Sequence, residues 1–138
     1  MTDGWEAALA EASSASWTRR VRAGRGLASF AHVPEVAEAL VRLLLDAEDT
    51  AVTRRTAEAL ARAGTPAAVK LIARAVAGAD DNQADWLRTG VQDALADRDG
   101  VPDFAAACRE LARDPEEAVR RGAEDLSAWT DDPGDTQC

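Results

Sequence analysis

The chain has 138 residues with 25 acidic and 16 basic side chains, which give it a net charge of −9. This length fits a single domain, and a chain of this size buries roughly 68% of its extended surface on folding. No stretch approaches the roughly 18 uninterrupted apolar residues of a membrane-spanning helix, and acidic Asp3 and Glu6 stand where a secretory signal would be basic. We therefore expect a cytoplasmic protein without a membrane segment.

The composition predicts an all-α fold, because the chain is rich in alanine and has no tyrosine, whereas strands favour β-branched and aromatic residues. Prolines in the first turn and capping side chains such as Thr65 and Asp114 mark helix starts. Four antiparallel helix pairs are expected in one domain over residues 1–129, followed by a disordered acidic tail over residues 130–138. In chain order, the expected helices cover residues 3–13, 16–31, 34–45, 49–63, 66–77, 82–97, 102–113 and 115–129.

A repeat runs through these helix pairs. Leucines at positions 27, 60, 95 and 126 follow similar segments and are 33, 35 and 31 residues apart. The second and fourth copies read Thr53-Arg-Arg-Thr-Ala-Glu-Ala-Leu60 and Val119-Arg-Arg-Gly-Ala-Glu-Asp-Leu126, each after an Asp-rich turn, whereas the third has Arg88-Thr-Gly-Val. Over roughly residues 16–129, this pattern resembles the short type of HEAT-like repeat. The resemblance implies an α-solenoid whose second helices line a concave binding surface.

Positions two, five and six before each repeat leucine should face away from the core. Arginines gather at the N-terminal end of this surface, while residues 79–138 carry 16 acids against 6 bases. These side chains either form ordinary i,i+4 pairs such as Arg54–Glu58 on a solvated face, or present arginines to an acidic partner. The candidate partner-binding residues are Arg19, Arg22, Arg25, Arg54, Arg55, Glu58, Trp86, Asp93 and Arg121, and Arg20 lies on the same helix as the first three.

Four tryptophans are a second notable feature, because this residue is enriched in binding hot spots. Trp5 and Trp129 are expected to pack the first and last helices. Trp17 and Trp86 are expected to pack between repeats, with an exposed contact role for Trp86 as the alternative.

Groups for catalysis or metal binding are sparse. The single histidine, His32, lies in a turn without a Cys or His neighbour, and Cys108 falls at a repeat position that predicts burial. The carboxylate clusters fall at helix junctions, where capping explains them. We therefore expect no catalytic residue, no metal and no cofactor.

The leading hypothesis is a non-enzymatic, monomeric module that binds another protein through its concave surface. The first alternative is a resemblance to the DNA glycosylases built of HEAT-like repeats, with Trp86, Arg55, Arg22 and Asp93 in the groove. The charge of −10 over residues 79–138 makes nucleic acid an unfavourable partner. The second alternative is a resemblance to phycobilisome lyases, which would make the chain a modifier of a cofactor-bearing protein, but only the repeat length supports it.

Overall fold

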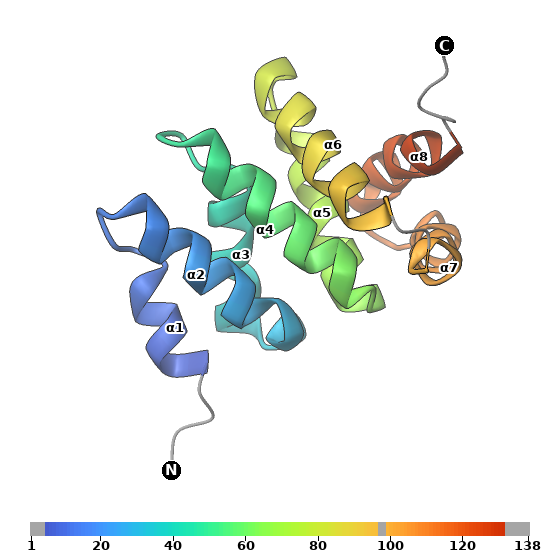
Figure 1. Ribbon diagram of the computed structural model, residues 1–138. Coiled ribbons are helices and arrows are strands. Elements are labelled where there is room, and N and C mark those ends of the chain that lie inside the picture. The colour runs from blue at the N-terminus through green and yellow to red at the C-terminus, as the bar shows by residue number, and fades with distance from the viewer. Residues whose placement is uncertain (1–4, 97–98, 132–138) are drawn as a thin grey trace.

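The computed structural model describes residues 5–96 and 99–131, and over these residues the chain forms helices and no strand (Figure 1). None of the described helices is both long and apolar enough to cross a membrane. The helices are α1 (Trp5–Glu11), α2 (Trp17–Leu27), a 3-10 turn (Ala28–Phe30), α3 (Pro34–Leu44), α4 (Thr50–Ala63), α5 (Pro66–Gly78), α6 (Asp81–Leu95), α7 (Val101–Leu111) and α8 (Glu117–Asp131).

Side-chain caps explain where several helices begin. The predicted Thr65 cap is confirmed, because its hydroxyl accepts the Ala68 N–H at 3.2 Å. Asp80 and Gln83 form a reciprocal capping box at the start of α6. At the other end, α4 stops at Gly64, whose φ of 66° suits glycine.

Both ends of α8 differ from the expected helix over residues 115–129. It begins at Glu117, because the Asp114 carboxylate accepts the Glu116 N–H at 3.0 Å and holds the preceding residues in a turn. It runs through Asp131, two residues into the expected tail. The rest of that tail, residues 132–138, lies outside the described residues.

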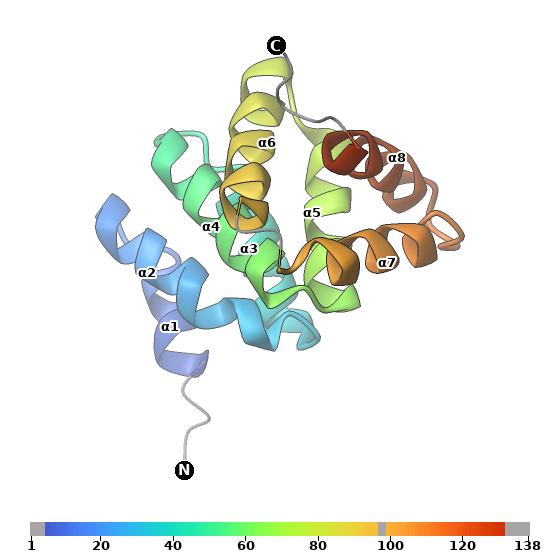
Figure 2. The ribbon, with the colours of Figure 1, turned by 45° about the vertical axis from the view of Figure 1, so that its right-hand side comes forward.

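The helices form two layers, with α2, α4 and α6 side by side in front of α1, α3 and α5 (Figures 1 and 2). The most extensive contact joins α4 to α6, and the contact of α2 with α4 is also large. Leu27 and Leu60 are fully buried between the layers, as the repeat predicted. Cys108 is buried as predicted, and Trp5 and Trp129 pack against the core.

The third repeat has a different register from the one that its leucine suggests. Leu95 is only partly buried, whereas Ala94 and Val91 belong to the core. Ala94 therefore takes the place of the repeat leucine. A β-carbon added to Gly90, four residues earlier, would collide with the Arg54 carbonyl oxygen and meet the Ala57 side chain at 2.9 Å. Small residues are needed here because α6 lies directly on the backbone of α4.

The last helix pair does not continue the front layer. α8 packs mainly against α5, and α7 lies against both α5 and α8, so that the last pair turns aside from α6 (Figure 2). A β-carbon on Gly122 would collide with the Ala73 backbone of α5. The absence of a side chain at Gly122 thus permits this close crossing.

Two ion pairs hold the turn before α8 against α5. Lys70 Nζ lies 3.3 Å from Asp114 Oδ1, and Arg74 Nη2 lies 2.9 Å from Glu116 Oε1. Because the two cations are four residues apart, they lie on one face of α5 and reach the same turn. The hydrogen bond from the Glu116 N–H, followed by the hydrogen bond and charge of Lys70, lowers the pKa of Asp114.

The first prediction concerns Gly122. We expect Gly122→Ala to lower the free energy of unfolding by about 1–3 kcal/mol, because its methyl group would force α8 away from α5. Gly78→Ala is the matched control, since nothing lies within 4 Å of a β-carbon there. That helical substitution should stabilise the protein by up to about 1 kcal/mol. Urea denaturation measures both effects, and equal values for the two variants would contradict the close crossing.

The second prediction concerns acid stability. A carboxyl group with a lowered folded pKa stabilises the protein above its unfolded value of about 3.9, and this contribution is lost as the pH falls through the folded value. We therefore expect Asp114→Asn to be less stable than the wild type at pH 7, with a difference that shrinks below about pH 4. Urea denaturation at several pH values measures this difference, and a constant difference down to pH 2.5 would refute it.

Candidate protein-binding surface

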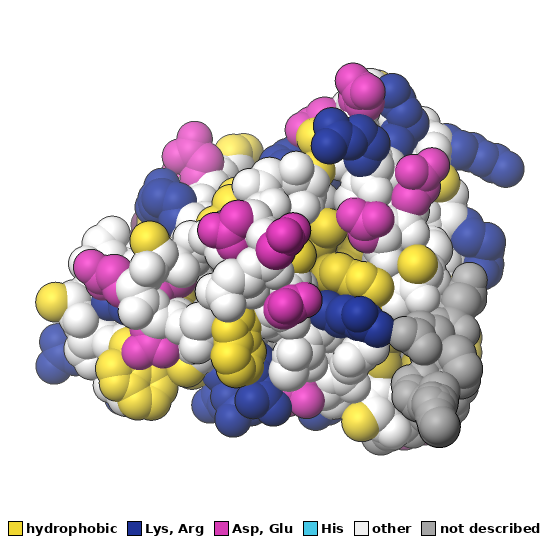
Figure 3. Space-filling view, turned by 90° about the horizontal axis from the view of Figure 1, so that it is seen from above, with side chains coloured by type: hydrophobic (Ala, Val, Ile, Leu, Met, Phe, Trp, Pro, Cys, Tyr) yellow, Lys and Arg dark blue, Asp and Glu magenta, His cyan; other side chains and the backbone are white. Residues whose placement is uncertain are grey.

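The outward side of α2, α4 and α6, called the second-helix face below, carries most of the candidate residues. Figure 3 looks down on the end where these helices begin and shows acidic and basic side chains interspersed, with hydrophobic groups between them. Two of the pockets that the described residues form lie beside these candidates, and their linings differ.

The first pocket, called the Trp17 pocket below, lies between α2 and the N-terminal part of α4. Its volume is about 440 Å³, and no acidic side chain lines it. Trp17 is 49% exposed, the only large hydrophobic residue exposed in the described part of the chain. The lining residues are Trp17, Thr18, Val21, Arg22, Arg25, Ala51 and Arg55. Three of the predicted arginines therefore surround one apolar hollow.

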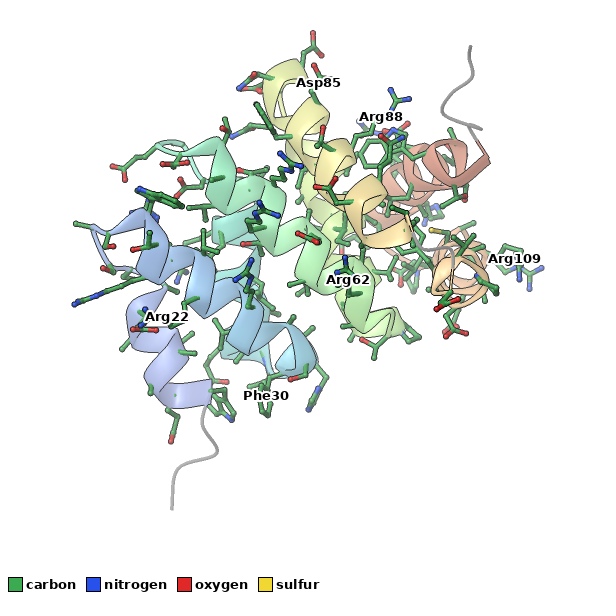
Figure 4. All side chains as sticks on the ribbon, in the orientation of Figure 1. Arg22, Phe30, Arg62, Asp85, Arg88 and Arg109 are labelled. Carbon is green, nitrogen blue, oxygen red and sulfur yellow. The ribbon has the colours of Figure 1, made fainter. Side chains whose placement is uncertain are left out.

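The arginines of the Trp17 pocket keep hydrogen-bonding capacity for a ligand. Arg22 makes one contact, from Nη1 to Glu11 Oε2 at 3.3 Å, and its side chain is 70% exposed (Figure 4). Arg55 donates through Nη1 to Glu58 Oε1 at 3.1 Å. Arg25 is exposed and has no ion pair among the described residues. Since a guanidinium group carries five N–H donors, several are available in the pocket.

Arg20 differs from its neighbours on α2, because its side chain is only 7% exposed. Its Nη1 donates to the Ser14 carbonyl oxygen at 2.8 Å, and its Nη2 donates to Asp46 Oδ2 at 3.4 Å. Nε lies 3.2 Å from Asp46 Oδ1 as an ion pair but is not aligned for a hydrogen bond. The grouping of Arg20 with the surface arginines was therefore wrong. It shares the repeat position of Thr53, Leu87 and Val119, which are all buried.

Arg54 and Asp93 form a bridge between α4 and α6. Arg54 Nε donates to Asp93 Oδ2 at 2.7 Å, and this hydrogen bond, with the charge of Asp93, raises the pKa of Arg54. The Arg54–Glu58 pair, which the alternative of a solvated face of i,i+4 pairs included, does not form. Glu58 instead accepts hydrogen bonds from Arg55 and Arg62, both at 3.1 Å. Arg54, Asp93 and Glu58 thus have partners within the protein.

The second pocket lies where the turn before α4 meets the start of α6. It has a volume of about 210 Å³, and partly buried Trp86 forms one wall. Its carboxylates have partners: Asp46 and Glu48 face Arg20, while Asp49 and Asp80 cap helices. The structure therefore separates Trp86 from Arg22 and Arg55, and the four residues of the glycosylase hypothesis do not form one site.

The remaining candidates lie apart from both pockets. Arg19 is exposed on α2, outside the lining of either one. Arg121 is exposed on α8, which packs against α5 and does not extend the front layer. Arg120 on the same helix donates to the Asp114 carbonyl oxygen at 2.7 Å, so it stabilises the start of α8.

The expectation that Trp17 packs between repeats was wrong, because half of its surface is exposed. Trp17 was also not among the candidate binding residues, although the repeat contains a signal for it. Trp17 stands ten positions before Leu27, and the corresponding positions of the other repeats are Thr50, Ala84 and Glu116. A tryptophan where its counterparts are small or polar indicates a surface role. With Ala94 as the third repeat position, Trp86 instead corresponds to buried Val52, which explains its partial burial.

Over the described residues, no group of three or more His, Cys, Asp or Glu side chains is arranged to hold a metal ion. Burial raises the pKa of the Cys108 thiol to about 11, so it stays protonated at neutral pH. His32 is exposed in its turn.

Comparison with protein families relates this architecture to known proteins. The family model of HEAT repeats matches residues 3–96, about two thirds of the chain. The chain belongs to the HEAT-repeat family. Comparisons with curated proteins and with solved structures gave no match. The HEAT match ends with α6, before the last helix pair leaves the front layer.

HEAT repeats generally mediate protein–protein interactions and are typically not catalytic. This family property agrees with the leading hypothesis at its coarser level, a role in binding other proteins. The family does not identify the partner or the surface that binds it.

The third prediction separates structural from surface arginines on α2. We expect Arg20→Ala to lower the free energy of unfolding by about 3–5 kcal/mol, because Asp46 would stay buried without its cation. Arg25→Ala, five residues along the same helix, should change it by at most about 0.5 kcal/mol. Chemical denaturation measures both variants. Similar losses for the two would mean that Arg25 also supports the fold.

Proposed function

We propose that this HEAT-repeat protein acts as a non-enzymatic module that binds one partner protein through the second-helix face. The single observation that carries the proposal is the Trp17 pocket, where an exposed tryptophan and three arginines surround a hollow. Tryptophan and arginine are the residues most enriched in binding hot spots. A large exposed apolar side chain beside arginines that keep free N–H donors is of no benefit to the isolated protein.

The packing of the front layer supports this choice of face. The Arg54–Asp93 bridge and the close contact at Gly90 fix α4 against α6, so a partner would meet a pre-formed surface. A rigid surface loses little conformational entropy on binding. The concave surface that the HEAT resemblance implies corresponds in this proposal to the second-helix face.

The test is capture of partners from an extract of the native cell by three versions of the protein. The face variant carries Arg25→Glu and Arg55→Glu, and the control carries Arg42→Glu and Arg109→Glu on α3 and α7. Both variants change the net charge by −4, and Arg109 lies at the opposite end from Arg22 (Figure 4). Circular dichroism first establishes that all three versions are folded.

We expect a protein that the wild type and the control capture equally and that the face variant captures at least about tenfold less, as for a loss of about 1.4 kcal/mol. Quantitative mass spectrometry measures the captured amounts. If nothing exceeds the background, or if the control loses the protein as strongly as the face variant does, the proposal fails.

A further inference from the structure

The Trp17 pocket combines an apolar interior with a basic rim. Val21 is buried at its base, Ala51 is partly buried, and the Trp17 side chain stands at its edge with half of its surface in water. Arg22 and Arg25 come from α2 and Arg55 comes from α4, so the cations lie on both sides of the hollow.

This rim contrasts with the charge of the whole chain. The net charge is −9, yet no Asp or Glu lines the Trp17 pocket. The acids that pair with the rim arginines leave most of their donors free, because Glu11 engages one Nη atom of Arg22 and Glu58 engages one Nη atom of Arg55. A negatively charged ligand would meet repulsion from residues 79–138, which carry 16 acids against 6 bases, and attraction here. Electrostatic complementarity of this kind selects partners and orients their approach.

We infer that the Trp17 pocket is the docking site for a short acidic peptide segment of the partner, with one apolar side chain seated against Trp17 and flanking carboxylates on the arginines. This inference rests on the proposed function and names the chemistry of the bound segment. The apolar side chain removes Trp17 and Val21 from water, which is the main source of affinity. The carboxylates pair with Arg22, Arg25 and Arg55 and fix the direction of the segment.

The test uses a panel of synthetic nine-residue peptides and the full chain. Each peptide has Asp and Glu on both sides of one central Leu, Ile, Met or Phe. One control peptide has a central Ser, and another has Lys in place of every acid. Binding is followed by calorimetry and by the four tryptophan indole N–H resonances in NMR spectra of the labelled protein. Trp17→Phe identifies the Trp17 resonance, because that signal disappears.

We expect at least one apolar-centred acidic peptide to shift the Trp17 resonance and leave that of Trp129 unchanged, since Trp129 lies on α8. The central Ser should weaken binding by about tenfold, in the range for loss of a hot-spot side chain. The Lys peptide should not bind. Raising the salt concentration from about 0.05 to 0.5 M should weaken binding severalfold, because the arginines are exposed and screened.

Two variants of α2 give a matched comparison. Arg25→Glu should weaken binding of the best peptide by about fivefold or more, because one exposed ion pair contributes up to about 1 kcal/mol. Arg19→Glu makes the same charge change on the same helix, outside the pocket lining, and should change affinity less than twofold. Equal effects of the two variants would mean that only overall charge matters and would overturn the inference.

Other occupants give distinct results, and each overturns the inference. A Trp17 shift on concentrating the protein alone would show that a second copy fills the pocket. A shift with a 12-base-pair DNA duplex but not with any peptide would show a nucleic-acid site. If no peptide binds while capture of the partner still depends on Arg25 and Arg55, the inference fails and the proposed function stands. If the proposed function itself fails, no partner is captured at all, so the two failures give different results.

Discussion

The structure depends on the close approach of helix backbones at positions that must stay small. Gly24 faces Thr56 across the contact of α2 with α4, and a β-carbon there would lie 2.5 Å from the threonine hydroxyl. Gly90 and Gly122 come closer still, since a β-carbon there would meet the backbone of α4 and of α5, respectively. At each position a β-carbon would force the two helices apart, so these glycines set the spacing of the stack.

Gly122 also shows how one repeat position can serve two packing arrangements. Gly90 belongs to α6, in the third repeat, and packs against α4, the second helix of the preceding repeat. The corresponding Gly122 belongs to α8, in the fourth repeat, and packs against α5. The ion pairs of Lys70 and Arg74 with the turn before α8 accompany the second arrangement. The front layer therefore ends at α6, and arginines on α8 cannot extend the basic surface of α2 and α4, although the sequence pattern aligns them.

Much of the fold was predictable from local signals, because prolines, capping residues and helical periodicity act within one helix. The register of the third repeat was not predictable in this way. Leu95 matches the repeat leucine in the sequence, but Ala94 and Val91 are the residues that enter the core. Burial depends on how close the neighbouring helix comes, which Gly90 determines. That one-residue shift also explains why Trp86 is partly buried. Arg20 is buried because it pairs with Asp46, 26 residues away, and no local sequence pattern specifies that contact.

Net charge gave a misleading picture of the binding surface because many carboxylates are already engaged. In the first half of the chain, Asp46 and Glu48 face buried Arg20, and Glu58 holds Arg55 and Arg62 together. Asp49 caps α4. These acids form ion pairs or helix caps within the protein, whereas Arg22 and Arg25 lie on the surface beside Trp17. An acidic chain can therefore present a basic pocket, because its excess negative charge belongs to residues 79–138 and the pocket is built from residues 17–55.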